Sequence, residues 1–382
     1  MPSNKKHHYV PKFVLKRFSE NRKSINLFVI EREKKILSAN LSNQCYKDYF
    51  YGADDGPEKA LGVLETESAV IIDKICAQGG LPTDRRERFS LLLFIVMQKA
   101  RTAAAADEFN EVSNQTLREV MKFDLKELGV EKDDVTIHLK EPALFSLHMA
   151  LRTYPLLIDL DVRLIRNTTE EDFILSDNPV VYYNQLLNSE ALGSTTGIAS
   201  KGLQIFFPLD DKNVLFFFDG TSYNVPGERW SSVMIDDRRD IYNLNMLQVC
   251  SAQNVFYFKD SKQGVDLIYR KARRCLAEKL PKMRVLNVNE SDDKTSRVIM
   301  MSRSQVRSNL SLTFVRVRKA AKQWRDWFRK PGVPRPAVAV RNPDLMKDYE
   351  EFSKLAEKGS IGWNDFFLFI DQKYPRQHSE AA

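Results

Sequence analysis

The chain has 382 residues, of which 43% are hydrophobic and 29% are charged, and its formal net charge at pH 7 is +7. This composition is typical of a soluble globular protein of one large or two smaller domains. No apolar run approaches the roughly 18 residues of a membrane span, and the basic N-terminus lacks the apolar stretch of a signal peptide. We therefore expect a soluble, cytoplasmic protein with no membrane partner.

The first part of the chain is predicted to be mainly helical. A short helix is expected from Pro11 to Phe18, and a strand follows at Ser24–Glu33, where Ile, Phe and Val favour extended structure. The next helix runs from Pro57 to about Ala77 and ends before Gly79-Gly80, a typical C-terminal signal.

Three more helices are expected in this part. The first begins after Thr83-Asp84, which offers an N-cap, and its middle is apolar on nearly every face, so that we expect it to be buried. The others run from Ala104 to about Leu128 and from Pro142 to about Ile158.

The middle of the chain has β character. Six segments rich in β-branched and aromatic residues are separated by turn residues. They are Asp161–Asn167, Phe173–Asp177, Val180–Asn184, Leu203–Leu209, Asn213–Gly220 and Asn254–Asp260. A helix is expected from Arg238 to Ala252. Helices followed by strands favour an α+β fold with a mostly antiparallel sheet over a repeated βαβ arrangement.

The C-terminal part is basic. A polar stretch from Asn287 to Arg297 suggests a division into a core domain, 1–286, and a basic helical extension, 287–382. Between Met301 and Val340 there are ten Arg or Lys residues against the single acid Asp326. Apolar residues at helical spacing from Val306 to Phe328 predict one amphipathic helix over Arg303–Lys330. Helices are also expected at Pro343–Lys358 and Trp363–Lys373.

The basic side chains of this predicted helix are candidate phosphate contacts for a nucleic acid. They are Arg307, Arg316, Arg318, Lys319, Lys322, Arg325 and Arg329. The alternative is a solvated basic face on a helix whose apolar stripe packs against the body. Oligomeric state is not predicted by the sequence.

Several polar residues lie inside apolar segments, where burial is costly without a partner or a function. Glu65 lies in the first long helix, and Gln98 and Arg101, three residues apart, share a helix face. Ser176-Asp177-Asn178 ends a strand, before Pro179. Each set also has a structural interpretation, because Asp-Asn-Pro forms turns and the others could tie helices together.

Two of the five histidines, His7 and His8, are adjacent in the opening KKHHYVPKF. HHYVP is similar to the first strand of a ββα-metal nuclease, in which a histidine is the general base. That motif needs a second metal-ligating His or Asn a few tens of residues on. No histidine lies between His8 and His138, and Asn40 or Asn43 would have to serve, so this likeness does not assign that fold. P-loop, GxGxxG, GxSxG and HExxH patterns are absent, and the four cysteines form no CxxC pair.

Taken in order, the motifs resemble those of the domain of unknown function 4238 family. The matching residues are His7-His8-Tyr9-Val10-Pro11, Leu64-Glu65, Gln98-Lys99-Ala100-Arg101-Thr102, Ser176-Asp177-Asn178-Pro179-Val180, Phe207-Pro208-Leu209 and Asn245-Met246-Leu247. The likeness covers roughly residues 5 to 260. It implies no established activity, but a shared pattern made largely of polar groups suggests that they converge on one site.

The leading hypothesis is an enzyme that cleaves phosphodiester bonds of RNA or DNA, for which a toxin or phage-defence role would fit. Its catalytic residues would be His7, His8, Glu65, Gln98, Arg101, Asp177 and Asn178. A histidine would be the general acid or base, and Arg101 would hold a phosphate. A divalent metal such as Mg or Mn would be bound by candidates His8, Glu65 and Asp177.

Two alternatives remain open. In one, the His, Glu, Arg and Asp residues form a non-catalytic structural network, and the basic helix binds a nucleic acid or a protein. In the other, a small phosphorylated ligand binds between the helical and β parts. In each case we expect the N-terminal arm to fold back toward Glu65, Arg101 and Asp177, with His8 facing inward and His7 facing solvent.

Overall fold

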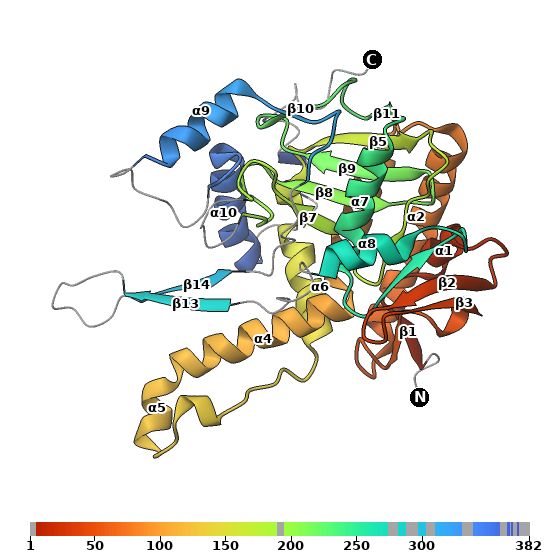
Figure 1. The fold of residues 1–382 in the computed structure, drawn as a ribbon. Coiled ribbons are helices and arrows are strands. Elements are labelled where there is room, and N and C mark those ends of the chain that lie inside the picture. The colour runs from red at the N-terminus through yellow and green to blue at the C-terminus, as the bar shows by residue number, and fades with distance from the viewer. Residues whose placement is uncertain are drawn as a thin grey trace.

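The computed structural model describes residues 5–188, 195–273, 282–287, 297–302, 310–330 and 339–359, with residues 365, 366, 368, 369 and 373. The fold is of the α+β class (Figure 1). The helices are α1 Lys12–Leu15, α2 Asp55–Gln78, α3 Arg85–Ala100, α4 Ala103–Val120, α5 Lys122–Glu127, α6 Pro142–Thr153, α7 Arg238–Ser251, α8 Val265–Ala272, α9 Lys319–Phe328 and α10 Pro343–Glu357. Short 3-10 turns lie at Lys16–Phe18, Leu41–Asn43, Lys132–Asp134 and Tyr154–Leu157.

The largest sheet has the strand order β11-β5-β9-β8-β7. Its strands are β5 Asp161–Asn167, β7 Val181–Tyr183, β8 Gln204–Pro208, β9 Asn213–Phe218 and β11 Ser231–Ile235. All neighbours are antiparallel except β11 and β5, which are parallel. The expected mostly antiparallel sheet is therefore confirmed.

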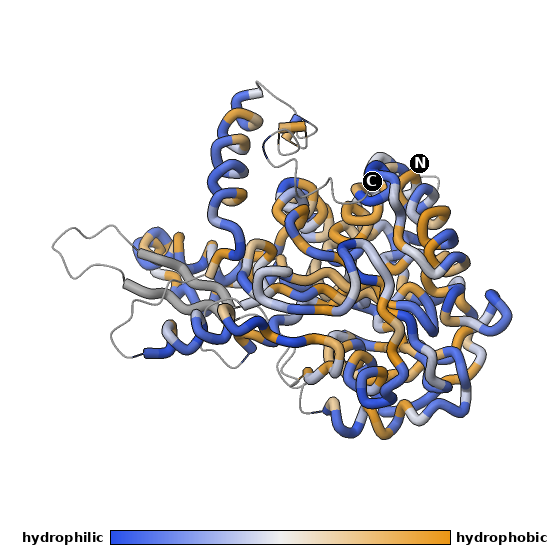
Figure 2. Tube along the Cα trace, turned by 90° about the horizontal axis from the view of Figure 1, so that it is seen from above, coloured by the Kyte–Doolittle hydropathy of each residue, from blue (hydrophilic) through white to orange (hydrophobic). Residues whose placement is uncertain are grey.

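Both faces of this sheet are covered. Leu215 and Phe217 of β9 face a core shared with α2, α3 and α6, whereas Phe216 and Phe218 face a second core shared with α7. Successive side chains of a strand point to opposite faces, so a strand covered on both sides must be apolar throughout. This explains the unbroken apolar run of β9 in the sequence. In Figure 2, hydrophobic and hydrophilic turns alternate along the helices, as expected for helices with one buried face.

A second, antiparallel sheet has the order β3-β2-β12-β6. It consists of β2 Ser24–Val29, β3 Lys34–Asn40, β6 Leu175–Ser176 and β12 Val255–Phe258. Three two-stranded ladders complete the β structure: β1 Lys6–His8 with β4 Tyr46–Asp48, β10 Tyr223–Asn224 with β15 Arg316–Val317, and β13 Lys282–Asn287 with β14 Arg297–Ser302. The sequence did not predict β1, β3, β4, β10, β11, β13, β14, β15 or α8.

The predicted helix ends agree closely with the observed ones. Gly79 ends α2 in the left-handed conformation, with a φ of 69°. The carboxylate of Asp84 accepts a hydrogen bond from the Glu87 N–H at 3.0 Å and so caps α3. All apolar residues of α3 from Leu91 to Met97 except the half-buried Leu93 are buried, as its apolar sequence predicted.

The predicted single helix over Arg303–Lys330 is wrong in its first half. Residues 303–309 lie outside the described part. Residues 310–318 are not helical but contain a turn at Thr313-Phe314 and the strand β15, and the helix α9 begins only at Lys319. Tertiary contacts hold this non-helical stretch, because Leu310 N–H donates to the Tyr183 hydroxyl and Thr313 donates to Asp240. The predicted apolar stripe is nevertheless buried at Leu310, Phe314 and Phe328.

The C-terminal segments pack on the body. Leu310, Leu312, Phe314 and Ala321 belong to the second core, and Phe352 of α10 belongs to the first. These contacts join the extension to the core. The division of the chain into two domains at residue 286 stays a prediction. Of the predicted last helix, most residues lie outside the described part. Within the described residues no single helix is long and apolar enough to cross a membrane, although α3 and α4, bent by 62°, reach that length together.

Candidate functional site

The N-terminal arm folds back onto the helices, as the sequence predicted. Strand β1 pairs with β4, so that His7 lies opposite Lys47 and His8 opposite Tyr46. His7 and His8 are 1% and 8% exposed, so the expectation that one of them faces solvent is wrong. Both rings are buried because the arm is covered on one side by the Tyr49–Tyr51 segment and on the other by the Gln44 turn.

Arg101 is the residue that joins the arm to the helices. It is the C-cap of α3, and its side chain is only 2% exposed. Its Nη1 donates to Glu65 Oε1 at 2.6 Å, its Nη2 donates to the His8 carbonyl at 2.6 Å, and its Nε donates to the Tyr51 hydroxyl at 3.2 Å. The sequence predicted that the Arg101 guanidinium binds a phosphate through two hydrogen bonds. In the structure, each nitrogen of that guanidinium already donates to a group within the chain.

Gln98 and Thr102, which lie beside Arg101 in the same motif, also bind backbone groups of the chain. Gln98, fully buried on α3, donates to the Tyr9 carbonyl at 3.0 Å. The Thr102 hydroxyl accepts from the Ala105 N–H and caps α4. The Gln-x-x-Arg-Thr pattern thus fixes two consecutive arm carbonyls, those of His8 and Tyr9, and begins the next helix.

His8 is held as a neutral imidazole. Its Nδ1 lies 3.0 Å from the Gln44 carbonyl, which can only accept, so that Nδ1 carries the proton and Nε2 carries the lone pair. Among the described residues, no hydrogen-bond partner faces the buried Nε2. Burial, followed by the charge of Lys12, lowers the pKa of His8 to about 4. His8 is therefore a candidate proton acceptor at neutral pH.

The lowered pKa of His8 makes stability depend on pH. The unfolded chain protonates this ring near pH 6.5, whereas the folded chain does so only near pH 4. Between these values the unfolded state binds more protons, so the free energy of unfolding falls as the pH falls. Between pH 6.5 and pH 4, the free energy of unfolding of His8→Gln should therefore fall by about 3 kcal/mol less than that of the wild type. Urea titrations across the window test it, and the exposed His148, changed to Gln, serves as the control.

His7 and Glu58 occupy the other side of the arm. The Tyr51 N–H donates to His7 Nδ1 at 3.2 Å, and the Tyr51 ring stacks on the imidazole with centroids 5.6 Å apart. Burial raises the pKa of Glu58, and the charges of His7 and Arg101 oppose that rise. Burial raises the pKa of Tyr51 to about 12. This side of the arm is a closed polar contact between β1 and α2.

The Ser-Asp-Asn-Pro motif forms a second polar group. The Asp177 carboxylate, 2% exposed, accepts from the N–H groups of Gln253, Asn254 and Val255 at 2.7, 2.8 and 3.2 Å. Ser176 donates from its N–H and its hydroxyl to Gln248 Oε1. These bonds dock the strand end onto the end of α7 and the turn that follows it.

Asn178 links the two groups. Its Nδ2 donates to the Ser251 carbonyl at 3.2 Å, while its Oδ1 accepts from Lys99 Nζ and the Thr102 hydroxyl at 3.4 Å. The charge of Asp177 also contributes to the raised pKa of Tyr9, after burial and Cys45. The predicted single site is thus two adjoining groups, with His7, His8, Glu65, Gln98 and Arg101 in one, and Asp177 and Asn178 in the other.

Asp177 has a large expected effect on stability. Asp177→Ala leaves three backbone N–H groups without their acceptor, and each buried unsatisfied donor costs about 1–3 kcal/mol. Because Asn254 is exposed and can bind water, we expect a total loss of about 2–4 kcal/mol. Asp177→Asn keeps one oxygen and should lose less. Equal unfolding midpoints in urea for the wild type and Asp177→Ala would contradict the role as an acceptor.

The predicted metal ligands are not brought together. In the part of the chain that the structure describes, no three His, Cys, Asp or Glu side chains form a group suited to a metal ion. Glu65 is bound to Arg101, and Asp177 is bound to backbone N–H groups. His8, Glu65 and Asp177 therefore do not fit a shared metal site.

The basic C-terminal residues lie on and before α9. Of those predicted to bind nucleic acid, Arg307 lies outside the described residues, whereas Arg316, Lys319, Lys322 and Arg329 are exposed. Arg318 donates to the carbonyls of Gly220 and Tyr223, and the guanidinium of Arg325 pairs with Asp326. Lys330 and the 52% exposed Trp327 extend this surface. We call Arg316, Lys319, Lys322, Trp327, Arg329 and Lys330 the α9 surface.

A smaller basic surface lies on the arm. Lys6, Lys12 and Lys47 are exposed there. Lys6 Nζ lies 4.4 Å from the centroid of the Tyr46 ring, and Lys47 Nζ lies 5.2 Å from that of Phe50. Lysines beside aromatic rings are suited to nucleic acid, because phosphates attract the cations and bases stack on the rings.

Sequence reasoning missed several residues of the cluster. Tyr51 and Gln248 are as deeply involved as the predicted residues, but an aromatic residue in a loop and a glutamine in a helix carry no distinctive pattern. Glu58 had a usable signal, because it precedes Glu65 by seven residues and so lies on the same helix face.

The molecule is an α+β protein whose buried polar residues anchor an N-terminal arm. The chain belongs to the family described as protein of unknown function (DUF4238), whose model matches residues 6–262. Neither the curated proteins nor the solved structures include a significant match to it.

Proposed function

We propose that the protein binds single-stranded nucleic acid through the α9 surface. The observation that carries the proposal is an exposed Trp327 among the exposed lysines 319, 322 and 330 and the arginines 316 and 329. Cations near a backbone and an aromatic ring for a base are the two elements of sequence-independent recognition of single strands.

The packing of α9 supports this proposal. The apolar side of α9 packs against the rest of the protein, since Ala321 and Phe328 are buried and Trp324 stacks on Phe328 with ring centroids 5.3 Å apart. The basic side is therefore turned outward. Asp326 is the only acid within Arg316–Lys330, and it is already paired with Arg325. A surface of this charge attracts a polyanion over a distance of about one Debye length, near 10 Å in 0.1 M salt.

A binding assay tests the proposal. Labelled single-stranded RNA, single-stranded DNA and duplex DNA are titrated with the full chain at several salt concentrations. We expect the single strands to bind more tightly than the duplex, with the logarithm of the affinity falling linearly with that of the salt concentration. Affinity that does not change with salt, or no binding to any of the three, would reject the proposal.

The second candidate is cleavage of RNA at the arm, and it rests on His8. A neutral imidazole whose Nε2 lone pair has no partner among the described residues can accept a proton once the arm moves enough to expose this buried nitrogen. The exposed Lys6 and Lys12 stand close enough to influence its pKa. A phosphate bound at these lysines would offset their charges, raise the pKa of His8 and so make it a stronger base.

The cleavage step is an internal transfer of the phosphoryl group from the 5′ oxygen to the 2′ oxygen. His8 Nε2 accepts the proton of a ribose 2′-hydroxyl, the 2′ oxygen forms a bond to phosphorus, and the bond from phosphorus to the 5′ oxygen breaks. The 5′ oxygen takes a proton from solvent, and a 2′,3′-cyclic phosphate remains.

His8→Gln separates cleavage from binding. We expect this variant to retain binding at α9 but to cleave RNA about 10²–10⁴-fold more slowly, the usual contribution of a general base. His148→Gln is the matched control. Cleavage that survives in His8→Gln would remove His8 as the base, and a folded wild type that cleaves no RNA would reject this candidate.

A further inference from the structure

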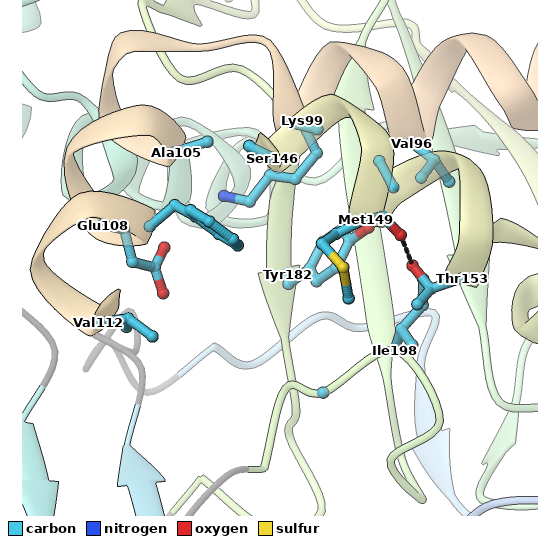
Figure 3. Close-up of a pocket in the computed structure, with 14 residues that line it drawn as sticks. Val96, Lys99, Ala105, Glu108, Val112, Ser146, Met149, Thr153, Tyr182 and Ile198 are labelled. Atoms are coloured by element: carbon cyan, nitrogen blue, oxygen red, sulfur yellow. Dashed lines mark hydrogen bonds between the residues drawn. The ribbon is translucent and has the colours of Figure 1, made fainter. Parts of the chain in front are cut away.

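A helical hairpin projects from the body of the protein. It consists of α4, α5 and the return segment 128–141, and Figure 1 shows α5 at its far end, away from the two largest sheets. At the base of the hairpin, Val112 of α4 and Met149 of α6 line a cavity of about 430 Å³ together with Ile198 (Figure 3). Helix α4 has 18 residues, which span roughly 27 Å at 1.5 Å per residue. The tip of the hairpin therefore stands clear of the body.

The hairpin is held in shape by its own contacts. The Ile137 N–H donates to the Asn114 Oδ1 at 2.9 Å, and the Leu139 N–H donates to the Asn110 Oδ1 at 2.8 Å. These bonds fasten the return segment along α4. A surface that is ordered before it meets a partner loses less conformational entropy on binding.

Exposed apolar side chains are concentrated at the tip. Leu128 and Val120 are 76% and 62% exposed. Other exposed apolar side chains at the tip are Leu117, Met121 and Val130. Leu125 of α5 is buried, so one side of this short helix faces the hairpin and the other side faces out. Clustered exposed apolar side chains of this kind mark an interaction surface.

Charges of both signs surround these apolar side chains. Residues 117–134 contain four Arg or Lys and six Asp or Glu. Some of these charges are paired inside the hairpin, namely Arg118 with Asp133, Glu119 with Lys122 and Glu119 with Lys132. Lys126 and Glu127, adjacent in α5, are exposed and form no ion pair within the part of the chain that the structure describes. The outer side of α5 thus offers one cation and one anion to a partner.

We propose that this tip binds the tip of a second copy of the chain about a two-fold axis. In such a contact a residue i of one copy meets residue j of the other, and the reverse. An antiparallel pair of α5 helices therefore sets Lys126 of each copy against Glu127 of the other, and the exposed apolar side chains meet between them. Nucleic acid and anionic lipid offer only anions to a tip in which acids outnumber cations, whereas a second copy offers both signs.

The dimer contact leaves the α9 surface open. Figure 1 shows α9 at the top of the molecule and α5 at the bottom, so each copy keeps its own α9 surface. The affinity of one α9 surface for a short strand therefore does not depend on dimerisation. The dimer and the nucleic-acid binding proposed above are tested independently.

Sedimentation equilibrium of the full chain, without nucleic acid, tests the dimer. We expect the average mass to rise from 44.2 kDa toward twice that value as the protein concentration is raised from about 1 µM to about 200 µM. Val120→Ser removes an apolar side chain from the contact in both copies and should weaken dimerisation about tenfold or more. Val63→Ser is the matched control, because Val63 of α2 is also 62% exposed but lies outside the hairpin. Unchanged melting temperatures show that both variants are folded.

Two charge variants test whether the contact is self-complementary. Lys126→Glu places acids against acids at both positions, and Glu127→Lys places cations against cations. Each variant alone should dimerise about tenfold or more weakly than the wild type. An equimolar mixture of the two should dimerise again, because a doubly acidic face then meets a doubly basic one.

Three results would overturn the proposal. The first is a wild-type mass that stays at 44.2 kDa over the whole concentration range. The second is equal dimerisation of Val120→Ser and Val63→Ser, and the third is a mixture of the two charge variants that dimerises no better than either alone. Vesicles of neutral and of anionic lipid test the other occupant, since a monomer that sediments with vesicles would assign the tip to a membrane surface and reject the dimer.

Discussion

Replacing Arg101 with alanine is expected to lower the free energy of unfolding by about 3–5 kcal/mol, the cost of breaking a buried ion pair by removing one partner. Its guanidinium holds Glu65, the His8 carbonyl and the Tyr51 hydroxyl, and it is 2% exposed. Equilibrium unfolding in urea measures the loss. Trypsin should also cut the released arm faster at Lys6 and Lys12.

Two other variants make this result interpretable. Arg101→Lys keeps the charge but cannot reach all three partners, so its stability should lie between those of the wild type and Arg101→Ala. Lys74→Ala removes the surface pair with Glu87 and should cost less than about 1 kcal/mol. If Arg101→Ala lost no more than Lys74→Ala, Arg101 would not be the anchor of the arm.

Removing three cations from the α9 surface is expected to weaken binding of single-stranded RNA on the order of 100-fold at low salt. The variant is Lys319→Ala with Lys322→Ala and Lys330→Ala. Each phosphate contact to a single strand contributes about 0.7 to the slope of affinity against salt on logarithmic scales, so that slope should fall by about 2. Fluorescence anisotropy measures both quantities.

The control for this variant carries the same change in net charge elsewhere. Lys34→Ala, Lys59→Ala and Lys126→Ala remove three exposed lysines from other elements and should change affinity little. Trp327→Ala should cost about 1–3 kcal/mol if a base stacks on it. Equal losses for the α9 variant and the control would show that net charge alone, not the α9 surface, determines binding.

The sequence predicted elements well where the pattern was long. The helices α2, α3, α6, α7 and α10, with their caps at Gly79 and Asp84, agree with expectation to within a few residues. The seven predicted strands are present because each is a run of β-branched and aromatic residues with a turn on both sides. Such patterns are local, so a single sequence is enough to read them.

The prediction failed where tertiary contacts override local pattern. Leu310 to Arg318 has helical spacing, yet the Tyr183 hydroxyl and Asp240 hold it in a non-helical path against the second core. Helix propensity amounts to less than about 1 kcal/mol per residue, and such contacts exceed it. The strand β1 could not be foreseen either, because its partner β4 lies about 40 residues further on and both are only three residues long.

The sequence predicted which residues meet at the candidate site, but not which groups they bind. His7, His8, Glu65, Gln98 and Arg101 do meet, because two helices and the arm converge there. Their hydrogen bonds, however, go mainly to backbone groups of the arm and the turn before β4, namely the carbonyls of His8, Tyr9 and Gln44. Polar residues shared by a family can thus serve to fix an arm and a strand end. Of the predicted site residues that the structure describes, His8 keeps a buried ring nitrogen with no hydrogen-bond partner.

Ultraviolet cross-linking of single-stranded RNA to the full chain, followed by mass spectrometry of the peptides, tests the central proposal most directly. We expect the main cross-link to fall within Arg316–Lys330 and to include Trp327, with a marked loss in the variant that lacks Lys319, Lys322 and Lys330. Cross-links confined to other segments, with that variant unaffected, would contradict nucleic-acid binding at the α9 surface.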